Sequence, residues 1–194
     1  MRRGNLYDLP DGLPVPVDDG ACNHLAGMTT PPLVLPSTNG GEVNVAQASR
    51  AQRTVFFFYP RSGRPDEPQI LGWDDIPGAR GCTPQSCAFR DHFREFQALD
   101  VYVFGVSAQD TDYQREFAER THLPYPLLSD AAFALTTALR LPTFEAGGMT
   151  LIKRLTLVVS DGRIEKVFYP VFPPNKNAED VLAPASSAYS LTIR

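Results

Sequence analysis

The chain has 194 residues, of which 43% are hydrophobic, so it can bury the core of a single domain. Its formal net charge of −4 and its lack of any Lys/Arg-rich run argue against nucleic acid as a main partner. It has three cysteines, an odd number that makes a poor disulfide framework for a secreted protein. The longest strongly apolar run, residues 55–59, is far too short to span a membrane, so no membrane partner is expected.

Residues 1–31 are predicted to form an extended N-terminal arm, because prolines, glycines and aspartates are scattered through them. The basic start Met1-Arg2-Arg3 is followed by a polar stretch, which argues against a secretory signal and favours the cytoplasm. Cys22 and His24 also lie in this arm. We interpret them as a partly buried thiol and a surface imidazole, because no second ligand pair with metal-site spacing occurs elsewhere.

Residues 32–194 are expected to form one domain, which opens with a β-hairpin over residues 32–46. Residues 54–60 are continuously apolar and aromatic, as in a central strand that is covered on both faces. Residues 101–107 form a second strand of this kind, and a helix that starts near Cys82 lies between the two. This order predicts a βαβ crossover.

Two cysteines, Cys82 and Cys87, lie at the start of this crossover helix. Thr83 is the expected N-cap and Pro84 the first helical residue, where the missing N–H of proline costs nothing. Phenylalanines continue the helical spacing at positions 89, 93 and 96. Cys82 is therefore predicted to lie at a helix N-terminus, where free N–H groups and the helix dipole favour a thiolate. Open α/β sheets place their sites in this position, beyond the carboxyl end of a central strand.

The second half of the chain is predicted to alternate between helices and strands. The expected helices are residues 113–121, 131–140 and 177–182, the last of them broken or bent by Pro184. The expected strands are residues 123–130, 151–159 and 163–169, with a tight turn at 160–162 and a loop at 141–149. This element order indicates an α/β protein with a mixed sheet.

The segment from Gly81 to Asp91 reads Gly-Cys-Thr-Pro-Gln-Ser-Cys-Ala-Phe-Arg-Asp. It resembles the Gly-Cys-Thr-x-x-x-Cys-x-x-Arg-Asp segment of peroxiredoxins in the bacterioferritin comigratory protein (Q-type) subgroup. The Pro-Leu-Leu-Ser-Asp run at residues 126–130 is similar to a segment of the same family. The resemblance covers residues 32–182 and implies a thioredoxin-like fold, a central mixed β-sheet flanked by helices.

The resemblance also implies an activity, a thiol peroxidase that reduces hydrogen peroxide and organic hydroperoxides. Cys82 would attack the peroxide, and Cys87 would resolve the resulting sulfenic acid as an intramolecular disulfide, the atypical 2-Cys mechanism. Thioredoxin or a glutaredoxin-like protein would then reduce the disulfide. The subgroup implies a monomer, and no cofactor or metal is expected.

Three further residues are matched to the family. Arg154 lies in Lys-Arg-Leu-Thr-Leu, which resembles the Arg-x-Thr-Phe motif whose arginine holds the thiolate and peroxide. The alternative is a surface arginine at the start of a strand. Pro60 matches the proline that ends the central strand and shields the cysteine, although a strand end needs no such role. Gln85 falls where the family has Glu or Gln.

The chain departs from the family motif Pro-x-x-x-Thr-x-x-Cys, because Ala79 stands where the motif has threonine. Residues 61–80 look like an insertion, and they contain the only tryptophan, Trp73. Either the hydroxyl of Ser62 or Thr83 replaces the missing threonine, or backbone N–H groups suffice. We expect the insertion to border the site, the alternative being a surface loop with no role.

Two other functions stay open at this point. A thiol–disulfide oxidoreductase on the same fold would usually carry Cys-x-x-Cys, whereas four residues separate Cys82 from Cys87. A non-catalytic zinc module would need His92 to join the two cysteines, because their spacing is wider than in zinc knuckles. A peroxide assay with a thiol reductant, combined with metal analysis, separates the three functions.

Overall fold

The computed structural model describes residues 5–189, with the side chains of residues 5–183. At its centre is a five-stranded sheet with the strand order β5-β4-β3-β8-β9. Its strands are β3 (Arg53–Phe58), β4 (Val101–Ser107), β5 (Leu127–Ser129), β8 (Leu155–Ser160) and β9 (Arg163–Phe168). Strands β3, β4 and β5 pair in parallel, whereas β8 is antiparallel to both of its neighbours. The predicted α/β class with a mixed central sheet is confirmed.

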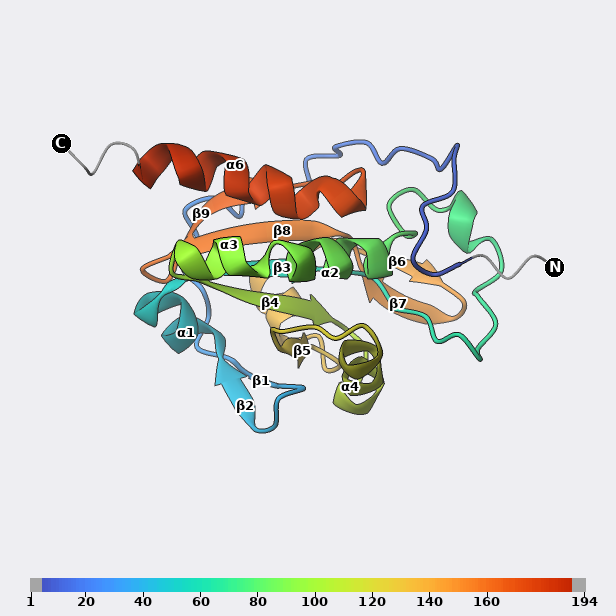
Figure 1. Ribbon diagram of the computed structural model, residues 1–194, viewed down its shortest axis with the longest axis horizontal. Coiled ribbons are helices and arrows are strands. Elements are labelled where there is room, and N and C mark those ends of the chain that lie inside the picture. Colours follow the sequence, from blue (N-terminus) through green and yellow to red (C-terminus); the bar gives the residue numbers. More distant parts are fainter. Residues whose placement is uncertain (1–4, 190–194) are drawn as a thin grey trace.

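Helices pack against both faces of this sheet, since each of its two core clusters contains helix residues. The helices are α1 (Val45–Ala51), α2 (Cys82–Asp91), α3 (Phe93–Ala98), α4 (Thr111–Arg120), α5 (Ala134–Leu139) and α6 (Asn177–Tyr189). Short 3-10 turns occur at Trp73–Asp75 and Pro174–Lys176. Figure 1 shows α2 and α3 following one another across one face of the sheet, with α6 running alongside them.

Strand β3 supplies both halves of the core, because successive side chains of a strand point to opposite faces. Phe56 and Phe58 pack in a cluster with residues of α1 and α5. Phe57 and Tyr59 pack in the opposite cluster, with residues of α2, α3, α4 and α6. All four rings are almost completely buried, as predicted for a central strand covered on both faces.

The crossover helix starts two residues earlier than predicted, at Cys82 instead of Pro84. Helix α2 begins at Cys82, and the N-cap is Gly81 with φ 104°. Thr83 is therefore inside the first turn and is not the cap. A Cβ at Gly81 would lie 2.3 Å from Cγ of Pro174, so both the backbone angle and the lack of space require glycine. Pro84 is the third helical residue, where a missing N–H is still tolerated.

The predicted loop at residues 141–149 is wrong. Strand β6 (Thr143–Ala146) pairs with β7 (Met149–Ile152) as an antiparallel hairpin, and the turn between them is Gly147-Gly148. Both glycines have positive φ, which a two-residue hairpin turn requires. The strand predicted over 151–159 is consequently two strands, because β7 ends at Ile152 and β8 begins at Leu155.

The other hairpins are confirmed, but one helix was missed and the C-terminal helix is longer than predicted. Strand β1 (Val34–Pro36) pairs with β2 (Glu42–Asn44), and β8 pairs with β9 around a turn at 161–162. Helix α1 was not predicted; Asn44 caps it by accepting a hydrogen bond from the Gln47 N–H, 3.0 Å away. Helix α6 was expected to break or bend at Pro184; it continues to Tyr189, so Pro184 does not break it.

The N-terminal arm crosses the surface of the sheet domain. Between residues 5 and 31 the only strand-like pairing described is an isolated bridge from Thr29 to Arg163. The arm is nevertheless anchored, because Leu25 is fully buried and Asp19 accepts hydrogen bonds from Lys153 and Tyr169. Met1-Arg2-Arg3 lies outside the described residues, as do the last five residues of the predicted 32–194 domain.

None of the helices within residues 5–189 combines the length and apolar character that crossing a membrane requires.

Candidate active site

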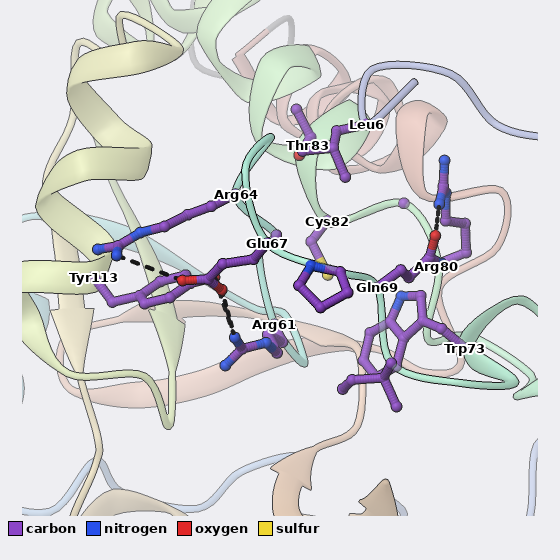
Figure 2. A pocket seen from close by; sticks show the side chains of 14 residues that line it. Leu6, Arg61, Arg64, Glu67, Gln69, Trp73, Arg80, Cys82, Thr83 and Tyr113 are labelled. Carbon is purple, nitrogen blue, oxygen red and sulfur yellow. Dashed lines mark hydrogen bonds and ion pairs between the residues drawn. The ribbon is translucent and has the colours of Figure 1, made fainter. Parts of the chain in front are cut away.

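Cys82 is the first residue of α2 and is only 4% exposed. Its sulfur borders a pocket of about 60 Å³, which Figure 2 shows from close by. The βαβ crossover places this helix start beyond the carboxyl end of β3, because β3 and β4 are parallel neighbours. The sequence prediction of a cysteine at this position is therefore confirmed in the structure.

Arg154 contacts the Cys82 sulfur directly, with Nη2 3.2 Å from Sγ. The same guanidinium donates hydrogen bonds to the carbonyl oxygens of Gly78, Ala79 and Arg80, at 3.2, 3.0 and 3.2 Å. Arg154 is 3% exposed, so it is not a surface arginine at a strand start. A fixed guanidinium at this place can stabilise negative charge that forms on the sulfur.

A buried polar network holds Arg154 from its other side. Its Nη1 donates to Oε1 of Gln85, and Nε2 of Gln85 donates to Oδ1 of Asn177, 2.9 Å away. The hydroxyl of Thr156 donates to the same Oδ1 at 2.7 Å. All four side chains are at most 3% exposed. This arrangement joins the first turn of α2, strand β8 and the start of α6.

Asn177 is the member of this network that sequence reasoning missed. It stands at the first position of α6, 92 residues from Gln85 along the chain. Nothing in the local pattern distinguishes it from an ordinary polar residue at a helix start, so only the tertiary structure reveals the contact. Gln85 was matched to the family on position alone, and the structure gives it a physical partner in Arg154.

The segment 61–80 borders the pocket, as predicted. Its residues Pro68, Ile70 and Trp73 contribute an apolar side, while Arg61, Arg64 and Glu67 contribute a polar one. Trp73 is 7% exposed and packs near Phe144, so the segment is anchored on the β6–β7 hairpin. A surface loop with no relation to the site is therefore the wrong interpretation.

Tyr113 of α4 orders the polar side of the pocket. Its hydroxyl donates to Oε2 of Glu67 at 2.6 Å, and Arg61 donates to both, at 3.1 Å to the tyrosine and 3.2 Å to the glutamate. The guanidinium of Arg64 lies over the tyrosine ring, 4.1 Å from its centroid. Burial and the Glu67 carboxylate raise the pKa of Tyr113, so its hydroxyl stays a proton donor.

The two hydroxyls proposed to replace the motif threonine lie in different places. Thr83 lines the pocket beside Cys82. Ser62 is fully buried and donates through both its N–H and its hydroxyl to Oε1 of Gln109, at 2.8 and 3.0 Å. Ala79 is fully buried in a cluster with Trp73. Of the two hydroxyls, Thr83 is therefore the one at the pocket.

Pro60 follows β3 and is buried, but it is not among the residues described as lining the pocket. Its shielding role stays a prediction.

Cys87 has different surroundings from Cys82, although both lie on α2. Its side chain borders a separate groove, together with Tyr7, Asp91 and Glu179. Burial raises the pKa of the Cys87 thiol, against a smaller opposing effect of Arg90. Both cysteines are free thiols in this structure. The two cysteines therefore line different sites, Cys82 the pocket and Cys87 the groove, although they lie on the same helix.

The third cysteine, Cys22, is 5% exposed and packs in the core cluster with Leu25. Burial raises the pKa of the Cys22 thiol to about 12, the effect of Asp19 and Asp18 adding to it. His92, the residue a zinc module would need, has one ring nitrogen 2.8 Å from Glu95 and the other 3.8 Å from Glu179. Within the described residues, no group of three or more candidate metal ligands occurs.

A cysteine at a helix start beside a buried arginine, on a mixed sheet flanked by helices, defines a thiol-based redox enzyme. The chain belongs to the redoxin family, whose profile matches residues 25–182. Its relatives within that family are peroxiredoxins of the Q or bacterioferritin comigratory type. The predicted subgroup is thereby confirmed, and the chain is a peroxidase by class.

The chain is similar to these proteins over most of its length. The chloroplastic peroxiredoxin Q of Sedum lineare is 30% identical over 157 residues, which is 80% of this chain and 75% of the relative. That of Gentiana triflora is 29% identical over 189 residues, 94% of this chain and 79% of the relative. The crystal structure of peroxidoxin BcpB from Mycobacterium tuberculosis is 27% identical with a TM-score of 0.68, over 87% of this chain and 97% of that one. The thioredoxin-like fold is confirmed.

Proposed function

We propose that this chain reduces hydroperoxides by a two-cysteine route in which Cys82 is oxidised and Cys87 resolves it. The observation that supports this most directly is the 3.2 Å contact between Arg154 Nη2 and Cys82 Sγ beside a pocket. We further propose that the chain works as a monomer and that a thioredoxin or glutaredoxin-like protein regenerates it.

The first step exchanges two electrons between sulfur and peroxide. The Cys82 thiolate attacks one oxygen of the O–O bond, which breaks and leaves that oxygen on sulfur as a sulfenic acid. The other oxygen departs as an alkoxide or hydroxide and takes up a proton to become an alcohol or water. Arg154 is placed to stabilise the charge that develops on this oxygen, since its guanidinium is already fixed by three backbone carbonyls.

The second step forms the disulfide. The Cys87 sulfur, deprotonated for attack, displaces the sulfenic hydroxyl from Cys82, and water leaves. A dithiol reductant then attacks the disulfide, returns both cysteines to thiols and becomes oxidised itself. The raised pKa of Cys87 keeps it a thiol while it is half-buried, so exposure of this residue during the step would favour its reaction.

Disulfide formation requires α2 to change shape. Five positions separate the two cysteines on a regular helix, about 140° of rotation and about 7.5 Å of rise. A disulfide needs Cα atoms within about 4.4–6.8 Å and side chains that point together. The first turns of the helix must therefore unwind after Cys82 is oxidised.

The test is single-turnover oxidation with one equivalent of hydrogen peroxide, followed by mass spectrometry and by steady-state assays with thioredoxin. Cys82→Ser should consume no peroxide. Cys87→Ser should consume one equivalent and then stop, and Cys22→Ser should behave as the unchanged protein. The assignment of roles is reversed if Cys87→Ser loses the first oxidation while Cys82→Ser keeps it. Full turnover by Cys87→Ser would exclude its part in resolution.

A further inference from the structure

The N-terminal arm reaches the mouth of the Cys82 pocket. Leu6 lines this pocket, although it is 76 positions before Cys82 in the sequence. Its Cδ2 lies 3.2 Å from the position that a Cβ would occupy on Gly63. Figure 2 shows Leu6 and Trp73 on opposite sides of Cys82. One wall of the pocket is thus supplied by a segment outside the sheet, helices and hairpins of the fold.

A second arm residue packs against the start of α2. Cδ2 of Leu9 lies 2.8 Å from the position of a Cβ on Gly81, the N-cap of the helix. Tyr7, Asp8 and Leu9 also border the groove of Cys87. Residues 5–9, which we call the arm clasp, therefore lie between the surroundings of the two cysteines.

Arg80 fixes the arm clasp to the pocket. Its Nη2 donates to the carbonyl oxygen of Asn5 at 2.8 Å, and its Nη1 donates to Oε1 of Gln69 at 3.1 Å. The Nη1 atom is also 3.4 Å from Oδ1 of Asp74. Arg80 is 6% exposed and is two residues before Cys82. One guanidinium thus joins the arm, the segment 61–80 and the residues leading into the helix.

The pocket beside Cys82 is small. The pocket volume of about 60 Å³ compares with about 300–1,000 Å³ for pockets that hold drug-sized ligands. It has room for a peroxide group with few further atoms, but an aryl or long alkyl hydroperoxide would need the Leu6 side chain to move.

We propose that the arm clasp is a size filter and that Leu6 is a specificity-determining residue, which restricts Cys82 to small hydroperoxides. This inference rests on the proposed peroxidase function for its substrate, but the geometry of the filter also applies to any reagent that approaches the Cys82 sulfur. A bulky electrophile should be excluded in the same way as a bulky peroxide.

The test compares Leu6→Ala with Val17→Ala, an arm position that is 81% exposed and serves as the matched control. For each variant, kcat/KM is measured with hydrogen peroxide and with cumene hydroperoxide. Leu6→Ala should raise the kcat/KM for cumene hydroperoxide relative to that for hydrogen peroxide by about tenfold. This is the lower end of the change in specificity that an altered apolar pocket contact gives. Val17→Ala should leave the ratio unchanged.

The second measurement needs no peroxide. The rates at which Cys82 reacts with N-ethylmaleimide and with the larger N-(1-pyrenyl)maleimide are followed by mass spectrometry of the Cys82 peptide. Leu6→Ala should raise the relative rate of the larger reagent, and Arg80→Leu, which frees the clasp, should do the same. Equal ratios in unchanged protein and both variants would overturn the size filter.

The two measurements separate the two proposals. If the unchanged protein reduces neither peroxide, the proposed function fails while the maleimide ratio still decides the size filter. If hydrogen peroxide is reduced and neither ratio responds to Leu6→Ala, the function stands and the size filter is wrong.

Discussion

The buried site and the segments that cover it are held by different kinds of contact. Cys82, Arg154, Gln85 and Asn177 are all at most 4% exposed and linked by hydrogen bonds within the sheet and its helices. The covering segments have buried anchors in Arg80 and Trp73, and they add partly exposed ion pairs such as Arg61–Glu67 and Lys153–Asp19. Breaking one member of a buried network leaves polar groups unsatisfied, whereas exposed ion pairs contribute little.

This difference shows that the groups proposed to react with peroxide and the groups that control entry to the pocket lie in different parts of the chain. Groups that must keep a fixed geometry are placed where displacement is costly. Groups that must admit a substrate or allow a helix to unwind are placed where displacement costs little. Changes in the buried network should therefore affect all peroxides alike, while changes in the covering segments should affect selectivity or stability.

The largest effect is expected from Arg154→Ala. Loss of the only guanidinium described in contact with Cys82 should lower the rate with every peroxide by roughly 10²-fold or more, because preorganised donors at developing charge carry effects of that size. Stopped-flow oxidation measures the change. Lys166→Ala, which removes a cation from the neighbouring strand β9, is the control. A rate within twofold of the unchanged protein would place Arg154 outside the reaction.

The next prediction concerns α2 in the disulfide form. Amides of residues 85–91 should lose most of their protection against hydrogen exchange when the Cys82–Cys87 disulfide forms, because the helix cannot close that bond as a regular helix. Amides of β3 and β4 serve as the internal control and should stay protected. The fluorescence of Trp73, beside the same pocket, should change between the two forms. Equal protection of α2 in reduced and verified disulfide protein would contradict the unwinding.

A smaller effect is expected from Asn177→Ala, which removes the acceptor shared by Gln85 and Thr156. If the looser hold on Arg154 raises the activation free energy of Cys82 oxidation by about 1.4 kcal/mol, the reaction slows about tenfold. Asn177→Asp retains the acceptor oxygen, and the Nδ2 atom it replaces has no hydrogen-bond partner among the described residues. It should therefore restore most of the rate. Equal losses in both variants at unchanged stability would show that Asn177 does not position Arg154.

The smallest effect is expected from Asp19→Asn in the arm. Hydrogen bonds from Lys153 and Tyr169 lower the pKa of Asp19 from 3.8 to about 2. A lowered pKa in the folded state means that the ionised carboxylate stabilises the protein above about pH 3.8, and that this contribution is lost as the pH falls toward 2. The variant should thus melt slightly below the unchanged protein at pH 5, with the difference disappearing near pH 2.

Thermal melts across this pH range, with the exposed Asp66→Asn as control, measure the contribution of Asp19. A difference that stays constant from pH 5 to pH 2 would show that the Asp19 carboxylate does not anchor the arm through its charge.

Local sequence patterns predicted the central strands and the crossover helix, because each of these elements is set by residues that are close together in the sequence. The aromatic run of β3, the apolar run of β4 and the helical phenylalanine spacing between them depend on the period of each element, which neighbouring residues fix. The β6–β7 hairpin was missed although Gly147-Gly148 is a hairpin turn, because the residues beside it were interpreted as loop. Thr83 was misplaced as the cap because Gly81 takes that position with a positive φ, and Pro174 and Leu9 leave no room for a side chain there.

The sequence by itself determined the α/β class, the place of Cys82 at a helix start and, by resemblance, Arg154 as its partner. Only the tertiary structure decided that Asn177 supports Gln85, that Trp73 and Leu6 line opposite sides of one pocket (Figure 2), and that Arg80 joins the two segments that carry them. The physical reason is distance along the chain. Propensity and periodicity act over a few residues, whereas a pocket wall or a buried hydrogen bond joins segments that meet only when the whole core is packed.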